Sequence, residues 1–216
     1  MRQMLMAFLI LFFGCARTPE EMPFSKSDVR AHAELAAWLK LWTPPLSPLT
    51  ASSFRLVNDS NDFWTIDIFS SYGSAGFPPK QLGRLEFSPD STWAVDLWYD
   101  QVDSSGAFVR GLDTYVALVN LRGRHAFQVL TCGPDGGFDV ATWISASSFL
   151  VGGWWESEGD PPGGIEPVIY RIDLQPRRVR AFQGPPIDQK YVVPLEAAVQ
   201  EQWRARFPSL HWYEVE

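Results

Sequence analysis

Two pairs of adjacent aromatic residues are the clearest chemical signal in this chain of 216 residues. They are Trp98–Tyr99 and Trp154–Trp155, each placed where an alternating apolar segment opens into a long acidic stretch. Neighbouring residues of a strand point to opposite faces, so one ring of each pair must leave the face that its neighbour occupies. Such rings stack on sugars or on the apolar side chains of a partner protein, which makes these four residues candidate ligand-binding residues. The alternative is that all four belong to the core.

Carboxylates supply a second candidate chemistry. Asp96, Asp100 and Asp103 lie in and after one predicted strand, and paired acids hydrolyse glycosides when their separation in space is right. Two sets of oxygen ligands also alternate in predicted turns: Glu156, Glu158 and Asp160, and Asn58, Ser60 and Asp62. Calcium prefers such ligands, but neither set has the full spacing of a calcium-binding loop. Solvated loop acids are the simpler interpretation.

Other signatures of catalysis are missing from the sequence. Its three histidines, His32, His125 and His211, are too far apart to predict a zinc site, and it has neither a Gly-x-Ser-x-Gly elbow nor a phosphate-binding loop. Hydrophobic residues make up 46% of the chain and charged residues 20%, as in a folded protein. A net charge of −7 disfavours a nucleic-acid partner. We expect no cofactor and no metal, and a binding role rather than a reaction.

The N-terminus carries the features of an export signal. Arg2 precedes an unbroken apolar run over residues 4–13, which ends in Gly14-Cys15-Ala16. That run is too short to span a bilayer as a helix, which needs about 20 residues, and has the length of the apolar region of a signal peptide. The Cys directly after Gly resembles the lipobox of bacterial lipoproteins, over residues 1–16. The resemblance implies that residues 1–14 are a signal peptide and that Cys15 becomes a diacylated N-terminus, with chains such as palmitate.

The same resemblance implies a location in the bacterial cell envelope. Each buried methylene contributes about 0.8 kcal/mol, so several acyl chains anchor a protein that one would not. Ala16 after the Cys is compatible with the outer membrane of a Gram-negative cell, and Phe12 departs from the Leu usual in the family. Two alternatives remain open. Cleavage between small residues would release a soluble secreted protein, and an uncleaved apolar stub would remain attached.

Only one further cysteine is present. If Cys15 carries lipid, Cys132 has no partner for an intramolecular disulfide. Residues 131–137 are typical of a tight turn, so we expect Cys132 to be a buried thiol rather than a nucleophile.

The elements that must position these residues begin and end with amphipathic helices. After a tether over residues 15–26, Ser27 and Asp28 favour a helix start, and Pro44 requires its end. Pro194 favours a second helix, which Pro208 ends. Each helix has an apolar stripe at helical spacing: Leu35, Trp38, Leu39 and Trp42 in the first, and Leu195, Val199, Trp203 and Phe207 in the second.

Between the helices the pattern changes to period two, which predicts an antiparallel all-β body in a single domain over residues 27–216. Residues 54–69 are expected to add a hairpin. The other predicted strands are 93–99, 114–120, 125–131, 138–144, 148–155, 168–174 and 178–182.

The strand pattern repeats. Residues 85–98 align without a gap with residues 141–154, which matches Phe87 to Trp143 and Trp93 to Phe149. Residues 117–122 also match 170–175, and residues 126–128 match 181–183. A four-stranded unit repeating at about 40–55 residues is typical of propeller blades. The units are about 82–131 and 138–183.

The turn Phe87-Ser88-Pro89-Asp90 resembles that of WD40-like and TolB-type propeller blades. This resemblance implies a mainly β fold of two tandem four-stranded antiparallel meanders. A closed propeller needs at least four blades, so we expect an open body whose edges the two helices cover. A single twisted meander with an accidental repeat is the alternative.

Overall fold

The computed structural model describes the parts of the chain that build two sheets and one helix. These are residues 22–24, 33–42, 49–61, 66–67, 85–97, 114–123, 125–157, 164–187, 201 and 205. Within them lie an α-helix, α2 (Ala33–Leu41), and a short 3-10 helix, η1 (Ala51–Ser53). The described helices include none that is both long and apolar enough to cross a membrane.

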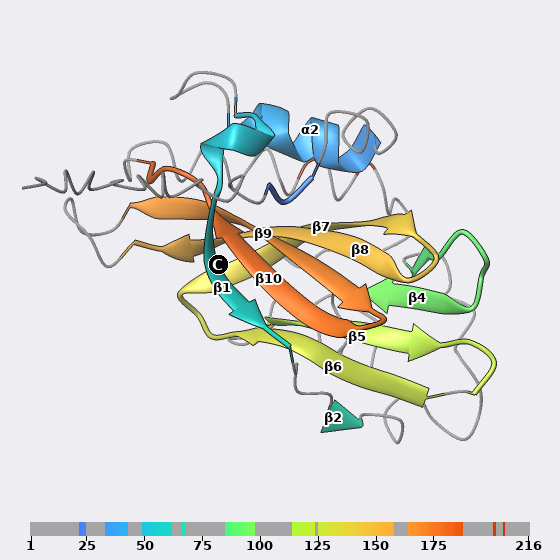
Figure 1. The fold of residues 1–216 in the computed structure, drawn as a ribbon. Helices are drawn as coiled ribbons and strands as arrows, with labels where there is room; N and C mark the ends of the chain where they lie inside the picture. Colours follow the sequence, from blue (N-terminus) through green and yellow to red (C-terminus); the bar gives the residue numbers. More distant parts are fainter. Residues whose placement is uncertain are drawn as a thin grey trace, which may run out of the picture.

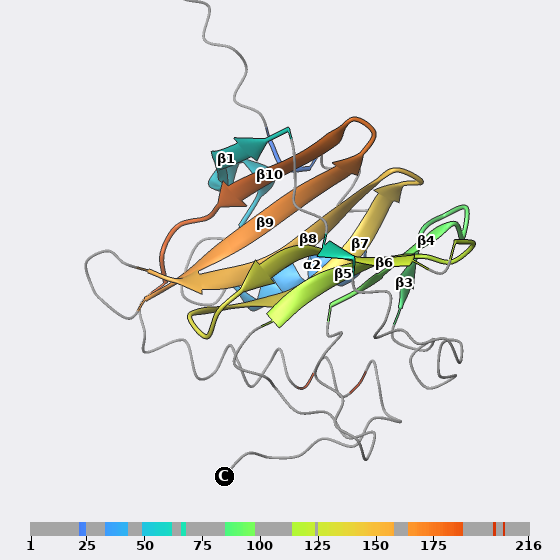
Figure 2. The same cartoon turned by 90° about the horizontal axis from the view of Figure 1, so that it is seen from below.

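Sheet A is an antiparallel meander with one added strand (Figure 2). Its four consecutive strands are β7 (Gly136–Ser145), β8 (Ser148–Glu156), β9 (Ile165–Leu174) and β10 (Arg177–Gln183). The added strand β1 (Arg55–Ser60) pairs with β10 and gives the order β1-β10-β9-β8-β7.

Sheet B has the same topology. Its meander consists of β3 (Glu86–Phe87), β4 (Trp93–Asp96), β5 (Thr114–Asn120) and β6 (His125–Cys132). The added strand β2 (Ile66–Asp67) pairs with β6, so the order is β2-β6-β5-β4-β3. Two tandem four-stranded antiparallel meanders, mainly β and not closed, are therefore confirmed.

The expected hairpin over residues 54–69 is wrong. Its two strands do not pair with each other, because β1 joins sheet A and β2 joins sheet B. β1 forms backbone hydrogen bonds with the outer edge of β10, and β2 forms them with the outer edge of β6. Each added strand thus pairs backbone groups that an edge strand would leave unpaired. The segment thus connects the two sheets.

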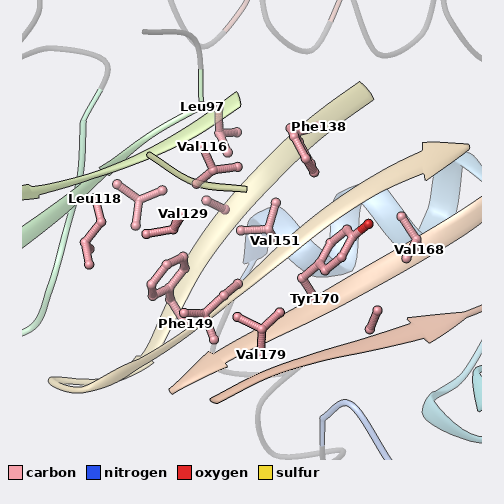
Figure 3. Close-up of a cluster of buried hydrophobic side chains, with 14 of the residues drawn as sticks. Leu97, Val116, Leu118, Val129, Phe138, Phe149, Val151, Val168, Tyr170 and Val179 are labelled. Carbon is pink, nitrogen blue, oxygen red and sulfur yellow. The ribbon is translucent and has the colours of Figure 1, made fainter. Parts of the chain in front are cut away.

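The main core lies between the sheets. Side chains from every meander strand except β3 point into it, and Figure 3 shows the side chains of the two sheets facing one another. Sheet B contributes Val95, Leu97, Val116, Leu118, Val129 and Cys132, and sheet A contributes Phe138, Ala141, Trp143, Phe149, Val151, Val168, Tyr170, Ile172, Val179 and Ala181.

Helix α2 covers the outer face of sheet A (Figure 1). All four residues of its predicted stripe are buried, which confirms the predicted packing. Trp38 packs on the sheet over Gly152, where a Cβ would be 3.1 Å from its ring, and its Nε1 donates a hydrogen bond to Asp139 at 2.9 Å. The helix therefore covers a face, whereas we expected it to cover an edge.

The predicted C-terminal helix lies outside the described residues except at two positions. Glu201 and Ala205 have helical backbone and are exposed.

The repeat alignment matches residues that face the same side of their sheets only in β4 and β8. Trp93 and Phe149 both pack on the inner core, as the alignment predicts, but Phe87 is 44% exposed while Trp143 is buried. The cause is a register shift in β7 between Trp143 and Ser145, since a slip of one residue moves a side chain to the other face.

The later matches are wrong by one position. Val95 pairs with Leu118, and its counterpart Val151 pairs with Tyr170. Leu118 and Tyr170 both face the inner core, whereas the alignment matched Tyr170 to Ala117 on the outer face. The segments that precede β5 and β9 differ in length, so the offset between the two meanders changes there. Similar residue types alone therefore did not show which residues of β5 and β9 are equivalent.

Candidate functional site

The adjacent residues Trp154 and Trp155 end strand β8 on opposite faces of sheet A. Both are half-buried. Trp155 packs against the core between the sheets, and Trp154 packs against the cluster on the side of α2. Each ring is thus partly buried and partly open to solvent.

Glycines of the neighbouring strand provide room for both indoles. Gly136 pairs with Trp155 and Gly137 with Trp154 across β7 and β8. A Cβ at Gly136 would be 3.0 Å from the Trp155 ring, and one at Gly137 would be 3.0 Å from Nε1 of Trp154. β7 is an edge strand of sheet A. The indoles therefore cover backbone that the glycines would otherwise leave exposed to solvent, as cross-strand aromatics do for edge glycines.

A third glycine fixes how closely the two strands approach. A Cβ at Gly153 would overlap the carbonyl oxygen of Gly137, so no larger residue fits there without moving backbone. The backbones of β7 and β8 therefore approach closely beneath the indoles, and only glycine fits at position 153.

The indole of Trp155 is also held from within the core. Its Nε1 donates a hydrogen bond to the Tyr170 hydroxyl at 2.9 Å, and the Tyr170 ring contacts Phe138 edge-on at 5.9 Å between centroids. Burial raises the pKa of Tyr170 well above its ordinary value, so this phenol stays neutral. Since the indole N–H has a partner inside the protein, Trp155 offers an outside ligand only its ring.

The other predicted site residues fall largely outside the described part of the chain. Trp98, Tyr99, Asp100 and Asp103 follow Leu97 and lie outside the described residues. Of the two alternating oxygen sets, Asp62, Glu158 and Asp160 are likewise not described, while Glu156 and Asn58 are exposed. Within the described ranges no three His, Cys, Asp or Glu side chains cluster closely enough to hold a metal ion.

Asp96 is described and is only 1% exposed. It pairs with Ala117 and so lies on the outer face of sheet B, next to the small side chain of Ala94 two residues earlier. A substrate would not reach this carboxylate in the structure as it stands.

Cys132 is a buried thiol at the end of β6. Its sulfur and the Thr114 hydroxyl lie within hydrogen-bonding distance on paired strands. The expectation of a buried thiol is confirmed.

Sequence reasoning missed a buried ion pair on the outer face of sheet A. The Arg180 guanidinium donates a hydrogen bond to Asp173, which also accepts one from the Ser148 hydroxyl at 2.6 Å. Burial lowers the pKa of Arg180. The alternation of charges in β9 and β10 was visible in the sequence, but it is also the pattern of a solvated strand face.

The Phe87–Asp90 turn is organised by one carboxylate. Asp90 accepts hydrogen bonds from the hydroxyls of Ser88 and Thr92 at 2.7 and 2.9 Å, and from the Thr92 backbone N–H at 3.1 Å. These bonds hold the pKa of Asp90 below its ordinary value. Ser88 in turn accepts the N–H of Trp93 at 3.0 Å, and Ser91 takes a left-handed φ of 54°.

No known family model, no curated protein and no solved structure matches this chain.

Proposed function

We propose that this chain is an exported, lipid-anchored binding module of the bacterial cell envelope. Acylated Cys15 would hold it to the membrane, and the Trp154–Trp155 end of sheet A would bind an envelope protein or glycan. Trp98 and Tyr99, which the sequence alignment matches to this pair, are further candidate binding residues.

The proposed anchor depends on the leader sequence and on where the folded body begins. Pro23 and Phe24 are buried, and the Phe24 ring packs edge-on against Phe54 at 6.3 Å. If Cys15 is the acylated N-terminus, only the residues from Cys15 to Met22 precede this buried start. Eight residues span at most roughly 25 Å, which would keep the body close to the membrane surface.

One observation carries the binding role: two adjacent indoles, Trp154 and Trp155, stand half-exposed against the glycines of the neighbouring strand. Aromatic rings bring a large apolar contact area, and they supply much of the contact energy in binding sites. The buried position of Asp96 weighs against the alternative of an exported hydrolase that uses loop carboxylates. A purely structural envelope protein is the third possibility.

We further propose that the two meanders are related to the blades of WD40-like and TolB-type propellers. Their shared strand order and the hydrogen-bonded Phe87–Asp90 turn support this relationship.

The binding role is tested by capture of a partner on the immobilised protein, from solubilised envelope proteins and, separately, from cell-wall glycan. Trp154→Ala should weaken capture roughly tenfold or more, as loss of a central aromatic contact does. The matched control is Phe87→Ala, which removes an exposed ring from the edge of sheet B. Equal capture by wild type and Trp154→Ala would contradict the role of this surface.

Two variants separate the alternatives. If Asp100→Asn abolishes glycan turnover while capture is unchanged, the protein is a hydrolase that uses a loop carboxylate. Cys15→Ala should abolish both incorporation of a fatty-acid analogue and recovery in the membrane fraction. An unmodified protein found wholly in the soluble fraction would exclude the anchor but not the binding surface.

A further inference from the structure

A row of polar side chains borders the Trp155 indole on the inner face of sheet A. Trp155 pairs with Glu166 across β8 and β9, so the two side chains stand side by side on the same face. Gln183 of β10 shares this face, since it pairs with Val168, a residue of the core between the sheets that Figure 3 labels. Glu166, Gln183 and Ser157 are half-buried, as Trp155 is, and therefore keep part of their surface in solvent.

The Glu166 carboxylate is held in place by two neutral donors. Its Oε1 accepts a hydrogen bond from the Ser157 hydroxyl at 3.0 Å, and its Oε2 accepts one from the Gln183 side-chain amide. Each carboxylate oxygen has two lone pairs and can accept a further hydrogen bond. The group thus presents two oriented acceptors beside an aromatic ring.

No positive charge in the described part of the chain neutralises Glu166. The ion pairs of the described residues join arginines of β9 and β10 to aspartates, and none of them includes Glu166. Arg55 lies on the same face, opposite Gln183 on β1, but it is exposed and forms no ion pair with Glu166. A half-buried carboxylate loses hydration that neutral donors replace only in part. A cation from outside the chain would compensate this charge.

We propose that this end of sheet A binds an arginine side chain of a partner protein, with the guanidinium stacked on Trp155 and hydrogen-bonded to Glu166. The proposal rests on the binding role proposed above, and it selects a protein rather than a glycan as the partner. A guanidinium is planar, stacks on aromatic faces and donates two parallel hydrogen bonds to a carboxylate. Trp155 supplies only its ring, because its Nε1 already bonds to Tyr170 at 2.9 Å.

The charge of the site favours this partner over a sugar. A neutral sugar hydroxyl would bond to the Glu166 carboxylate but would leave its negative charge uncompensated. The net charge of −7 on the whole chain also attracts a basic partner and speeds its association. Tryptophan and arginine are among the residues that contribute most to binding between proteins.

Peptide titration of the full-length chain tests the proposal. The probes are a blocked Gly-Arg-Gly tripeptide and its citrulline counterpart, in which a neutral urea group replaces the guanidinium. We expect the arginine peptide to shift the indole N–H resonance of Trp155, which Trp155→Phe identifies by its loss from the NMR spectrum. The citrulline peptide should bind at least roughly tenfold more weakly, and added salt should weaken only the arginine peptide.

Two variants with the same change of charge separate the site from the overall field of the protein. Glu166→Gln keeps the shape of the side chain and should weaken binding of the arginine peptide roughly tenfold. The matched control is Glu156→Gln, at an exposed residue that pairs with Ile165 and so lies on the opposite face of sheet A. This control should bind the arginine peptide as wild type does. Circular dichroism shows that each variant has folded.

Three results would overturn the proposal: no shift with the arginine peptide, equal binding of the arginine and citrulline peptides, or equal losses in the two glutamine variants. Soluble cell-wall glycan fragments are titrated in parallel. A Trp155 shift with these fragments but not with the arginine peptide would also overturn it, while the binding role of the surface would stand. Capture that Trp154→Ala leaves unchanged would instead remove the binding role itself.

Discussion

The indole of Trp154 lies across Gly137 on the neighbouring strand, so closely that a Cβ at Gly137 would be 3.0 Å from its Nε1 and 3.2 Å from its Cε2. The position of this ring therefore depends on the absence of a side chain on β7. The proposed binding surface therefore depends on Gly137 as much as on Trp154 itself.

Gly137→Ala is expected to displace this indole. The added methyl group forces the ring outward and costs about 1 kcal/mol of unfolding free energy, as modest overpacking does. One of the ten indole N–H resonances should shift in the NMR spectrum. Gly123→Ala is the control, because its methyl group would meet His125, an exposed ring that can swing away. An unchanged indole spectrum would show that Trp154 is not held by this contact.

The hydrogen bond between Trp155 and Tyr170 should show strong coupling in a double-mutant cycle. Tyr170→Phe leaves an indole N–H without its acceptor, at a cost of about 1–3 kcal/mol. Adding Trp155→Phe removes that donor as well, so the double variant should lose less than the sum of the two single variants. Urea denaturation measures all four proteins, and additive losses would mean that the bond contributes nothing.

Asp173→Asn should destabilise the protein far more than Asp59→Asn. Asp173 neutralises the buried Arg180, and breaking a buried ion pair costs about 3–5 kcal/mol. Asp59 pairs with Arg178 on the exposed edge of sheet A, through two hydrogen bonds of 2.6 and 2.9 Å, and solvent screens that pair. Thermal unfolding at low and high salt distinguishes them. Only the small effect of Asp59→Asn should fade with salt.

The turn carboxylate Asp90 should make stability depend on acid pH. Its pKa is lower in the folded protein than the ordinary value of about 3.9, so the folded state favours the charged form. This stabilisation is complete at neutral pH and is lost as the pH falls through the folded pKa.

Asp90→Asn should therefore lower the urea midpoint at pH 7, and the difference from wild type should shrink near pH 3. The exposed Asp135 provides the control substitution Asp135→Asn. A difference that is the same at both pH values would assign the effect to turn geometry rather than to charge.

The alternating pattern of the strands and the four-residue stripe of α2 predicted the elements and their buried faces. Hydrophobic periodicity is local, so it can be recognised without knowing what packs against it. The same alternation placed the rings of Trp154 and Trp155 on opposite faces before any contact was known.

Three features needed the tertiary structure. The pairing of β1 with β10 and of β2 with β6 joins residues more than a hundred positions apart in one case and about sixty in the other, and no local pattern specifies such partners. The register shift near Trp143 moves that ring inward and breaks the repeat that the sequence displays.

The burial of Arg180 is the third feature. By itself the sequence determined the periodicity of the strands and of α2, and the succession of two meanders, because each depends on neighbours along the chain. Only the tertiary structure decided which strands meet, which faces stack, and which charges are removed from water. Those outcomes depend on contacts between distant residues and on the solvent that the folded layers exclude.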